Sequence, residues 1–272
     1  MREPRRVALA RSALVVAALV FFLFPFFWLL QTSFKPPIDV FSAPPKWTFG
    51  PTLANYAATF RDFDVPLFLR NSTLIALGST ALSMALGVPA AYAIARSRSA
   101  GLRSFANVFL IIRMIPPVAM LLPVYLLMRD LRVLGTYQAV IAINTVLDSA
   151  FVVWMLQSTF RQVPTEIEDA ALCDGCSRFG AFWRVALPLA RPGLIAAALF
   201  CVLFSWNDFI FALLLTSPST KTLPVALLAT FSSQDIGWGE LAVMSQVTVL
   251  PVVAVAIYLN RNLVRGLTTG AE

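Results

Sequence analysis

Cys173 and Cys176 form a C-x-x-C pair, the spacing found in zinc sites and in thioredoxin-type redox sites. A structural zinc site takes about four ligands, but the chain contains no histidine, and Cys201 is its only other cysteine. Cys201 falls within a long apolar stretch, where it is not placed to complete such a site. We therefore expect neither a metal nor a redox function, and we interpret the pair as coincidental.

Arg113, Asp148 and Asp208 are each the only charged residue in a long apolar stretch. If these stretches cross a membrane, a charge near the centre costs about 2.5–3.5 kcal/mol. Arg113 and Asp148 both fall near the middle of their stretches, so pairing with each other would offset part of that cost. The pair can brace two helices or face a wet cavity, and the bracing role is the favoured interpretation.

Trp206, Asn207 and Asp208 follow one another directly. An indole ring beside an amide and a carboxylate suits a hydroxyl-rich solute such as a sugar, because binding sites combine apolar surface with a few placed polar groups. We group this triplet with the isolated charges and one further polar residue as a candidate substrate path: Arg113, Asn144, Asp148, Trp206, Asn207 and Asp208.

A polar segment between two apolar stretches carries signals for a short helix. Thr165, with Glu168 three residues later, makes a capping box and predicts that a helix begins here. Ala170 and Ala171 would let another backbone come close, and Gly175 is a natural helix stop. A second short helix is predicted from Ser177 to Leu187-Pro188. The two helices can form a plain surface hairpin or can dock into a partner's cleft.

The elements that must position these residues are apolar helices. Hydrophobic residues make up 58% of the 272-residue chain and charged residues only 13%, about half of the share usual in soluble domains. The net charge of +7 could indicate nucleic acid but is more typical of the inner loops of a membrane protein. A bilayer-crossing helix needs about 20 apolar residues. Six spans are predicted, at residues 12–32, 71–95, 104–128, 137–158, 192–215 and 241–260.

The distribution of basic residues predicts the orientation of these spans. If the N-terminus is inside, the inner segments carry 13 Lys and Arg and the outer segments carry 7. The inner segments are 1–11, 96–103, 161–191 and 261–272, and the outer ones are 35–70, 129–132 and 221–240. The excess inside places both termini in the cytoplasm. The outer segment 35–70 is rich in proline and is predicted to be an irregular cap with short helical pieces.

The polar segment 161–191 resembles the EAA loop of ABC importer permeases, which ends in an L-P-L-x-x-P signature. The matching residues are Glu168-Asp169-Ala170-Ala171, Asp174-Gly175 and Leu187-Pro188-Leu189-Ala190-Arg191-Pro192. Other segments resemble the maltose-type sugar permeases in the same order along the chain. They include Asn71-Ser72-Thr73-Leu74, Ala91-Tyr92-Ala93-Ile94-Ala95-Arg96, Trp206-Asn207-Asp208-Phe209 and Thr222-Leu223-Pro224-Val225.

The resemblance implies an all-α polytopic membrane protein, with residues 1–272 as one permease domain in a bacterial or archaeal plasma membrane. It implies an importer in which two permease subunits form the path. Two cytoplasmic ATPase subunits supply energy, and an external binding protein delivers a sugar or sugar derivative. The residues that would couple to the ATPase are Glu168, Asp169, Ala170, Ala171, Asp174 and Gly175. The chain contains no G-x-x-x-x-G-K-[S/T] loop, so ATP must bind to the partner, and neither a cofactor nor enzyme activity is expected here.

Three positions depart from the family pattern. Asp169 stands where the family has the EAA glutamate, so the charge is kept on a shorter side chain. Ala150 stands where relatives often have proline, which predicts a straighter fourth span, and Cys176 stands where the family has a small residue.

Two other classes of function remain as alternatives. A secondary transporter or channel could use Arg113, Asp148 and Asp208 as an ion or proton relay, but it would need no ATPase-docking loop. A membrane-embedded enzyme is disfavoured, because a chain without histidine and without clustered ligands lacks the groups of a catalytic centre. The sequence does not identify the sugar, nor whether this subunit or its partner contacts it.

Overall fold

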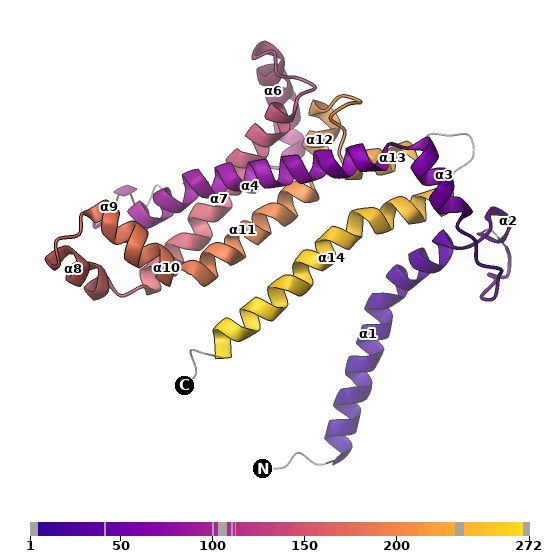
Figure 1. Cartoon of the computed structure of the whole chain (residues 1–272), viewed down its shortest axis with the longest axis horizontal. Helices are drawn as coiled ribbons and strands as arrows, with labels where there is room; N and C mark the ends of the chain where they lie inside the picture. The colour runs from indigo at the N-terminus through magenta and orange to yellow at the C-terminus, as the bar shows by residue number, and fades with distance from the viewer. Residues whose placement is uncertain are drawn as a thin grey trace. The chain divides into compact units, whose positions relative to one another are not determined.

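The computed structural model describes residues 5–40, 42–99, 101–102, 108–109, 111, 113–231 and 237–268. Within these residues every regular element is a helix, as Figure 1 shows. The first half contains α1 (Arg5–Ser33), α2 (Pro37–Val40), α3 (Ala54–Asp62), α4 (Val65–Arg96), α6 (Pro117–Asp130) and α7 (Tyr137–Gln162). The second half contains α8 (Thr165–Cys173), α9 (Arg178–Ala181), the π-helical turn η1 (Phe182–Ala186), α10 (Leu187–Leu189), α11 (Arg191–Trp206), α12 (Ile210–Leu215), α13 (Leu223–Ala229) and α14 (Trp238–Thr268).

Four helices in the described part of the chain are long and apolar enough to cross a membrane. They lie within Arg11–Ser33, Val65–Arg96, Tyr137–Gln162 and Trp238–Ile257. A fifth span is possible where the segments Arg178–Leu189 and Arg191–Trp206 meet at a bend of 78°. The fourth predicted span is one unbroken helix, α7.

Two of the six predicted spans differ from the continuous helices that were expected. The span 104–128 lies partly outside the described residues, and α6 begins only at Pro117, where proline suits the first helical turn. The span 192–215 is interrupted, because α11 ends at Trp206 and α12 begins at Ile210. Broken helices at membrane depth are tolerated where the freed backbone lines a cavity or is buried in protein.

The chain divides into two compact units. The first unit comprises Met1–Val65 and Ala226–Leu250, and the second comprises Pro66–Val225 and Pro251–Glu272. In the first unit, the segment 35–70 has the short helices predicted for it. Asn55 of α3 is buried and donates hydrogen bonds to the carbonyls of Ser33 (2.9 Å) and Lys35 (2.8 Å), so it ties α3 to the end of α1.

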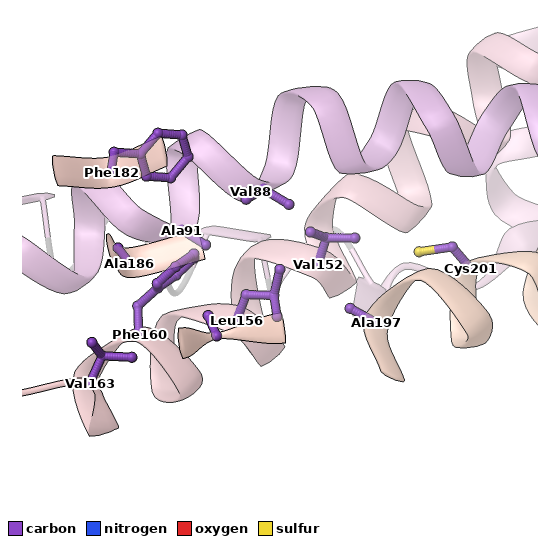
Figure 2. Packing of buried hydrophobic residues seen from close by; sticks show 11 residues of the cluster. Val88, Ala91, Val152, Leu156, Phe160, Val163, Phe182, Ala186, Ala197 and Cys201 are labelled. Atoms are coloured by element: carbon purple, nitrogen blue, oxygen red, sulfur yellow. The ribbon is translucent and has the colours of Figure 1, made fainter. Parts of the chain in front are cut away.

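The second unit has its core where α4, α7 and α11 pack together with the turn η1 (Figure 2). The buried side chains that Figure 2 labels include Val88 and Ala91 of α4, Val152, Leu156 and Phe160 of α7, and Ala197 and Cys201 of α11. Small residues let these helices approach closely, as is usual in membrane bundles. A Cβ atom added at Gly87 would lie 2.7 Å from Cγ1 of Val152. A glycine is therefore required where α4 meets α7.

Candidate functional site

A cavity of about 420 Å³ lies in the second unit, where the break between α11 and α12 faces α7 and the start of α6. The break places Asn207 and Asp208 outside regular helix, and Asp208 Oδ1 accepts a hydrogen bond from the backbone N–H of Phe211 at 3.2 Å. The lining comprises Arg113, Pro117, Asn144, Leu147, Asp148, Phe204, Ser205, Asn207, Asp208, Phe209, Ile210 and Phe211. Five of the six residues of the predicted substrate path are therefore brought together around one space.

The pairing of Arg113 with Asp148 that the sequence predicts is present. Arg113 Nη2 lies 3.9 Å from Asp148 Oδ1, which is too long for a hydrogen bond but within ion-pair range. The guanidinium also lies over the rings of Phe204 (4.3 Å to the centroid) and Phe151 (4.9 Å), an arrangement that stabilises a cation away from water. The Asp148 side chain is only 3% exposed, whereas that of Arg113 is 31% exposed.

Both carboxylates of the cavity keep an oxygen atom without a partner. Among the described residues, Oδ2 of Asp148 and Oδ2 of Asp208 are buried and make no hydrogen bond. Buried polar atoms are normally satisfied, and an unsatisfied one costs about 1–3 kcal/mol, more if it is charged. Both residues also line the cavity, so hydrogen-bonding capacity is left unused beside it.

Asn144 belongs to a polar contact between three helices beside the cavity. Its Nδ2 donates to Ser205 Oγ of α11 at 3.1 Å, and Ser79 of α4 donates to the same Ser205 oxygen at 2.8 Å. These side chains are buried. One wall of the cavity is thereby fixed to α4, a helix from which no residue was predicted to take part in the site.

Trp206 is not among the described residues that line this cavity, and the expected aromatic plane beside Asn207 and Asp208 is not formed. Trp206 is buried and instead lines a separate apolar cavity of about 280 Å³ with side chains of α4 and α14. Successive helical residues point about 100° apart, so neighbours in sequence do not share a face. The aromatic lining of the polar cavity comes from Phe204, Phe209 and Phe211.

The loop after α7 forms the second part of the candidate site. The residue before a proline disfavours helix, and α7 ends at Gln162, ahead of the Val163-Pro164 pair. The next helix, α8, begins at Thr165 as predicted. The predicted capping box is not formed, however, because Pro164 is the N-cap and no side chain caps the helix. The side chain of Glu168 instead contacts another helix, α4.

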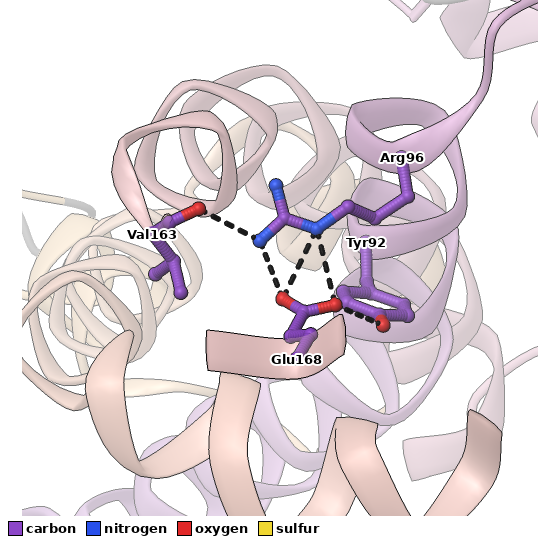
Figure 3. Close-up of polar contacts among 4 residues, drawn as sticks. All are labelled: Tyr92, Arg96, Val163 and Glu168. Atoms are coloured by element: carbon purple, nitrogen blue, oxygen red, sulfur yellow. Dashed lines mark hydrogen bonds and ion pairs between the residues drawn. The ribbon is translucent and has the colours of Figure 1, made fainter. Parts of the chain in front are cut away.

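Glu168 is buried and binds the end of α4, as Figure 3 shows. Tyr92 donates a hydrogen bond from its hydroxyl to Glu168 Oε2 at 2.7 Å. Arg96 Nε lies 3.1 and 3.2 Å from the two carboxylate oxygens, and Arg96 Nη2 donates to Oε1. Arg96 Nη2 also donates to the carbonyl of Val163 at 3.0 Å. Tyr92 and Arg96 are four residues apart and so lie on one face of α4, which is the sequence signal that was missed.

The rest of the EAA-like segment is open to the surroundings. Asp169, Ala170, Asp174 and Gly175 are exposed, and Ala171 is partly exposed. Gly175 has φ of +87°, a left-handed conformation that favours glycine. Backbone hydrogen bonds from Gly175 to Leu172 and from Cys176 to Ala171 close a Schellman motif. The helix stop predicted at Gly175 is confirmed.

The second helix of the loop is longer than predicted. Its start is capped by Ser177, whose hydroxyl accepts from the backbone N–H of Gly180 at 3.1 Å. It continues through η1 to Leu189 before the 78° bend and does not stop at Leu187. Phe179 (70% exposed) and Trp183 (56% exposed) leave a large apolar surface beside α8, an exposure that the sequence pattern did not show.

The cysteines of this loop are not joined to each other or to Cys201. Cys173, Cys176 and Cys201 are free thiols, and no cluster of potential metal ligands occurs among the described residues. The candidate site thus has two parts, the polar cavity described first and the surface loop described here, and they differ in both burial and charge.

Comparison with known proteins gives the family. The sequence profile described as "Binding-protein-dependent transport system inner membrane component" matches residues 83–269. The chain is 36% identical to a probable ABC transporter permease protein of Sinorhizobium fredii, over 92% of this chain and 90% of that protein. It is 35% identical to the sulfoquinovosyl glycerol transport system permease protein of Agrobacterium fabrum, over 91% and 88% of the two chains.

A solved structure shows the same fold at low sequence identity. It belongs to a bacterial ABC transporter involved in the import of the acidic polysaccharide alginate, with a TM-score of 0.80, 20% identity, and coverage of 96% of this chain and 99% of that chain. The profile and the curated relatives, rather than this likeness, establish membership. The chain belongs to the family of binding-protein-dependent transport system inner membrane components, and it is a multi-pass ABC transporter permease that transports rather than catalyses.

Proposed function

We propose that this permease imports a sugar or sugar derivative. The curated relatives include transport proteins named for sulfoquinovosyl glycerol, diacetylchitobiose and trehalose. The observation that carries the proposal is the cavity lined by Asp148 and Asp208, each of which has a buried oxygen with no hydrogen-bond partner among the described residues. Hydroxyl groups donate readily to carboxylate oxygens. The cavity holds two carboxylates and one guanidinium, so an uncharged polyhydroxylated solute suits it better than an anion.

The substrate path in this subunit consists of Arg113, Asn144, Asp148, Asn207 and Asp208, with Trp206 supporting it from outside the cavity. The two carboxylates accept hydroxyl protons, and Asn207, which is exposed, offers an amide. Arg113 lies 3.9 Å from Asp148, so its positive charge offsets part of the cost of burying that carboxylate. A relay of ions through the same charges is not favoured, because the chain belongs to a family of ABC transporter permeases and its segment 161–191 resembles their ATPase-coupling loop.

Six spans with both termini in the cytoplasm best accommodate the chain in a bacterial or archaeal plasma membrane. The broken segment from α11 to α12 then serves as the fifth span, and the segment around α6 as the third. The basic residues in the inner segments support this orientation. The complete importer contains a second permease subunit, two ATPase subunits and an external binding protein.

Coupling to the ATPase occurs through the exposed part of α8 and the turn after it. Asp169, Ala170, Ala171, Asp174 and Gly175 present charge and backbone to the partner. Phe179 and Trp183 add apolar surface next to them. A short helix with exposed small, acidic and aromatic residues suits a groove on another protein.

Co-purification of the ATPase with charge-reversal variants tests this assignment. Asp169→Lys should lower the amount of ATPase retained by the permease at least fivefold, because a positively charged ammonium replaces the carboxylate at the docking contact and reverses its interaction with the ATPase. Asp62→Lys, at an exposed aspartate of α3, is the matched control and should retain the ATPase. Equal retention by both variants would show that α8 is not the docking element. Screening sugars against the cognate binding protein tests the substrate class.

A further inference from the structure

Glu168 differs from the other acidic residues of its loop in being enclosed. It is 6% exposed, whereas Glu166, Asp169 and Asp174 are exposed. Both of its carboxylate oxygens accept hydrogen bonds from α4, one from Tyr92 and both from Arg96. A carboxylate used in this way is not available to a docking partner. Its place in the EAA-like segment therefore needs an explanation other than direct contact with the ATPase.

Arg96 joins three elements at one point (Figure 3). It extends from the last residue of α4, binds the carbonyl of Val163 after the end of α7, and binds Glu168 on α8. The ring of Tyr92 packs against Phe160 of α7 at 5.4 Å and Phe182 of η1 at 4.8 Å between centroids. Charged hydrogen bonds within an aromatic setting hold α8 against α4 in one arrangement.

From this point α4 stays in contact with its neighbours as far as the cavity. Gly87 packs closely on Val152, and Ser83 donates to the carbonyl of Thr145 at 3.2 Å. About one turn further from the loop, Ser79 donates to Ser205, which lines the cavity and also accepts from Asn144. A displacement of the loop end of α4 therefore has a continuous packed route to the cavity wall.

We propose that Glu168 is a positioning residue that fastens α8 to α4 through Arg96 and Tyr92, so that movement of the docked loop reaches the cavity along α4. The proposal rests on the proposed function, since it takes α8 as the element that the ATPase moves. It assigns separate tasks to two adjacent acidic residues. Asp169 faces the ATPase, and Glu168 transmits the resulting force to the membrane helices.

The test measures how accessible the cavity is to a labelling reagent in two nucleotide states of the ATPase. A single reporter, Asn207→Cys, is placed in a chain whose native cysteines are replaced (Cys173→Ser, Cys176→Ser and Cys201→Ala). Its labelling by a hydrophilic maleimide is measured in the purified complex with and without MgATP and vanadate, and co-purification of the ATPase is measured alongside. With Glu168 in place, MgATP and vanadate should change the labelling rate at least fivefold. With Glu168→Gln the change should fall below twofold while the ATPase is still retained.

Control variants distinguish loss of the contact between Glu168 and Arg96, here called the clamp, from a general loss of charge. Glu166→Gln makes the same substitution at an exposed residue of the same helix and should leave both measurements unchanged. Arg96→Gln should behave as Glu168→Gln does, and the double variant should be no worse than either single one, because the two residues act as one contact.

Four outcomes bear on the proposal differently. Loss of the ATPase in Glu168→Gln would overturn it by making Glu168 a docking residue. Retention of both the ATPase and the labelling change in Glu168→Gln would overturn it by making the contact dispensable. No labelling change even with Glu168 present would overturn the route along α4. Failure of any ATPase to co-purify with the starting protein would instead overturn the proposed function.

Discussion

The two ends of the second unit each hold a buried carboxylate beside a guanidinium, but the contacts differ. At the loop, Glu168 accepts hydrogen bonds from Arg96 and Tyr92 on both oxygens. At the cavity, Asp148 has one oxygen 3.9 Å from Arg113 and the other without a partner among the described residues. Arg96 is also less exposed than Arg113, with 17% against 31% of the side chain accessible.

This difference separates a structural charge from one that is available to a ligand. A fully satisfied buried pair holds two elements in a single arrangement, and removing one partner leaves a costly isolated charge. A half-satisfied pair beside a cavity keeps hydrogen-bonding capacity for water or solute, as expected of functional charges within a membrane. Under the proposed function, the buried charge of the loop serves rigidity and the charges of the cavity serve recognition.

Removing each guanidinium in turn gives the largest expected effect. Arg96→Met leaves Glu168 buried without its ion pair and should lower the free energy of unfolding by about 3–5 kcal/mol. Arg113→Met should lower it by about 1–3 kcal/mol, because water can enter the cavity and solvate Asp148. Unfolding of the purified permease in detergent measures both. Equal losses of unfolding free energy would mean that the two ion pairs contribute to stability in the same way.

A double variant tests whether Arg113 and Asp148 interact energetically. Arg113→Ala alone should reduce transport, because it leaves the Asp148 carboxylate uncompensated in a region of low dielectric constant. Adding Asp148→Ala should recover part of the stability, although the cavity then lacks one acceptor for the solute. The interaction free energy from the cycle should be about 0.5–3 kcal/mol. A double variant no more stable than the worse single one would show that the two side chains act independently.

The loop could be predicted well where its signals are local. Thr165 begins α8, and Gly175 takes the left-handed conformation that a helix stop requires, because both depend on residues within one turn. The role of Glu168 could not be predicted in this way. Its spacing from Thr165 satisfies the capping-box pattern, but Arg96 lies 72 positions away and forms the stronger, charged contact. A tertiary ion pair replaces the local cap.

The cavity was less predictable because its geometry depends on a helix break within an apolar stretch. The composition from residue 192 to 215 favours one continuous span, yet the chain leaves the helix after Trp206. Asp208 accepts from Phe211 at the start of the next helix, so part of its role is to support the break. The sequence correctly grouped Asn207 and Asp208 with the distant Arg113 and Asp148. Trp206, which the prediction grouped with them, lines a different cavity.

The smallest expected effect concerns the turn after α8, where no side chain is involved. Gly175→Ala introduces a Cβ at a backbone with φ of +87°, where nothing lies within 4 Å of the added atom. The cost is therefore backbone strain of about 1–2 kcal/mol, with no clash. Gly50 also has open space and no positive φ, so Gly50→Ala is the matched control and should be neutral.

The strain at position 175 should act on docking more than on stability, because relaxing it would turn the exposed end of α8 while Glu168 keeps the start of the helix on α4. The ATPase should then be retained about threefold less, and the clamp should stay intact. Measuring co-purification together with thermal unfolding separates the two effects. If Gly175→Ala instead destabilised the protein as much as Arg96→Met, the turn and the clamp would be one cooperative structure, and the assignment of docking and fastening to different residues of α8 would have to be abandoned.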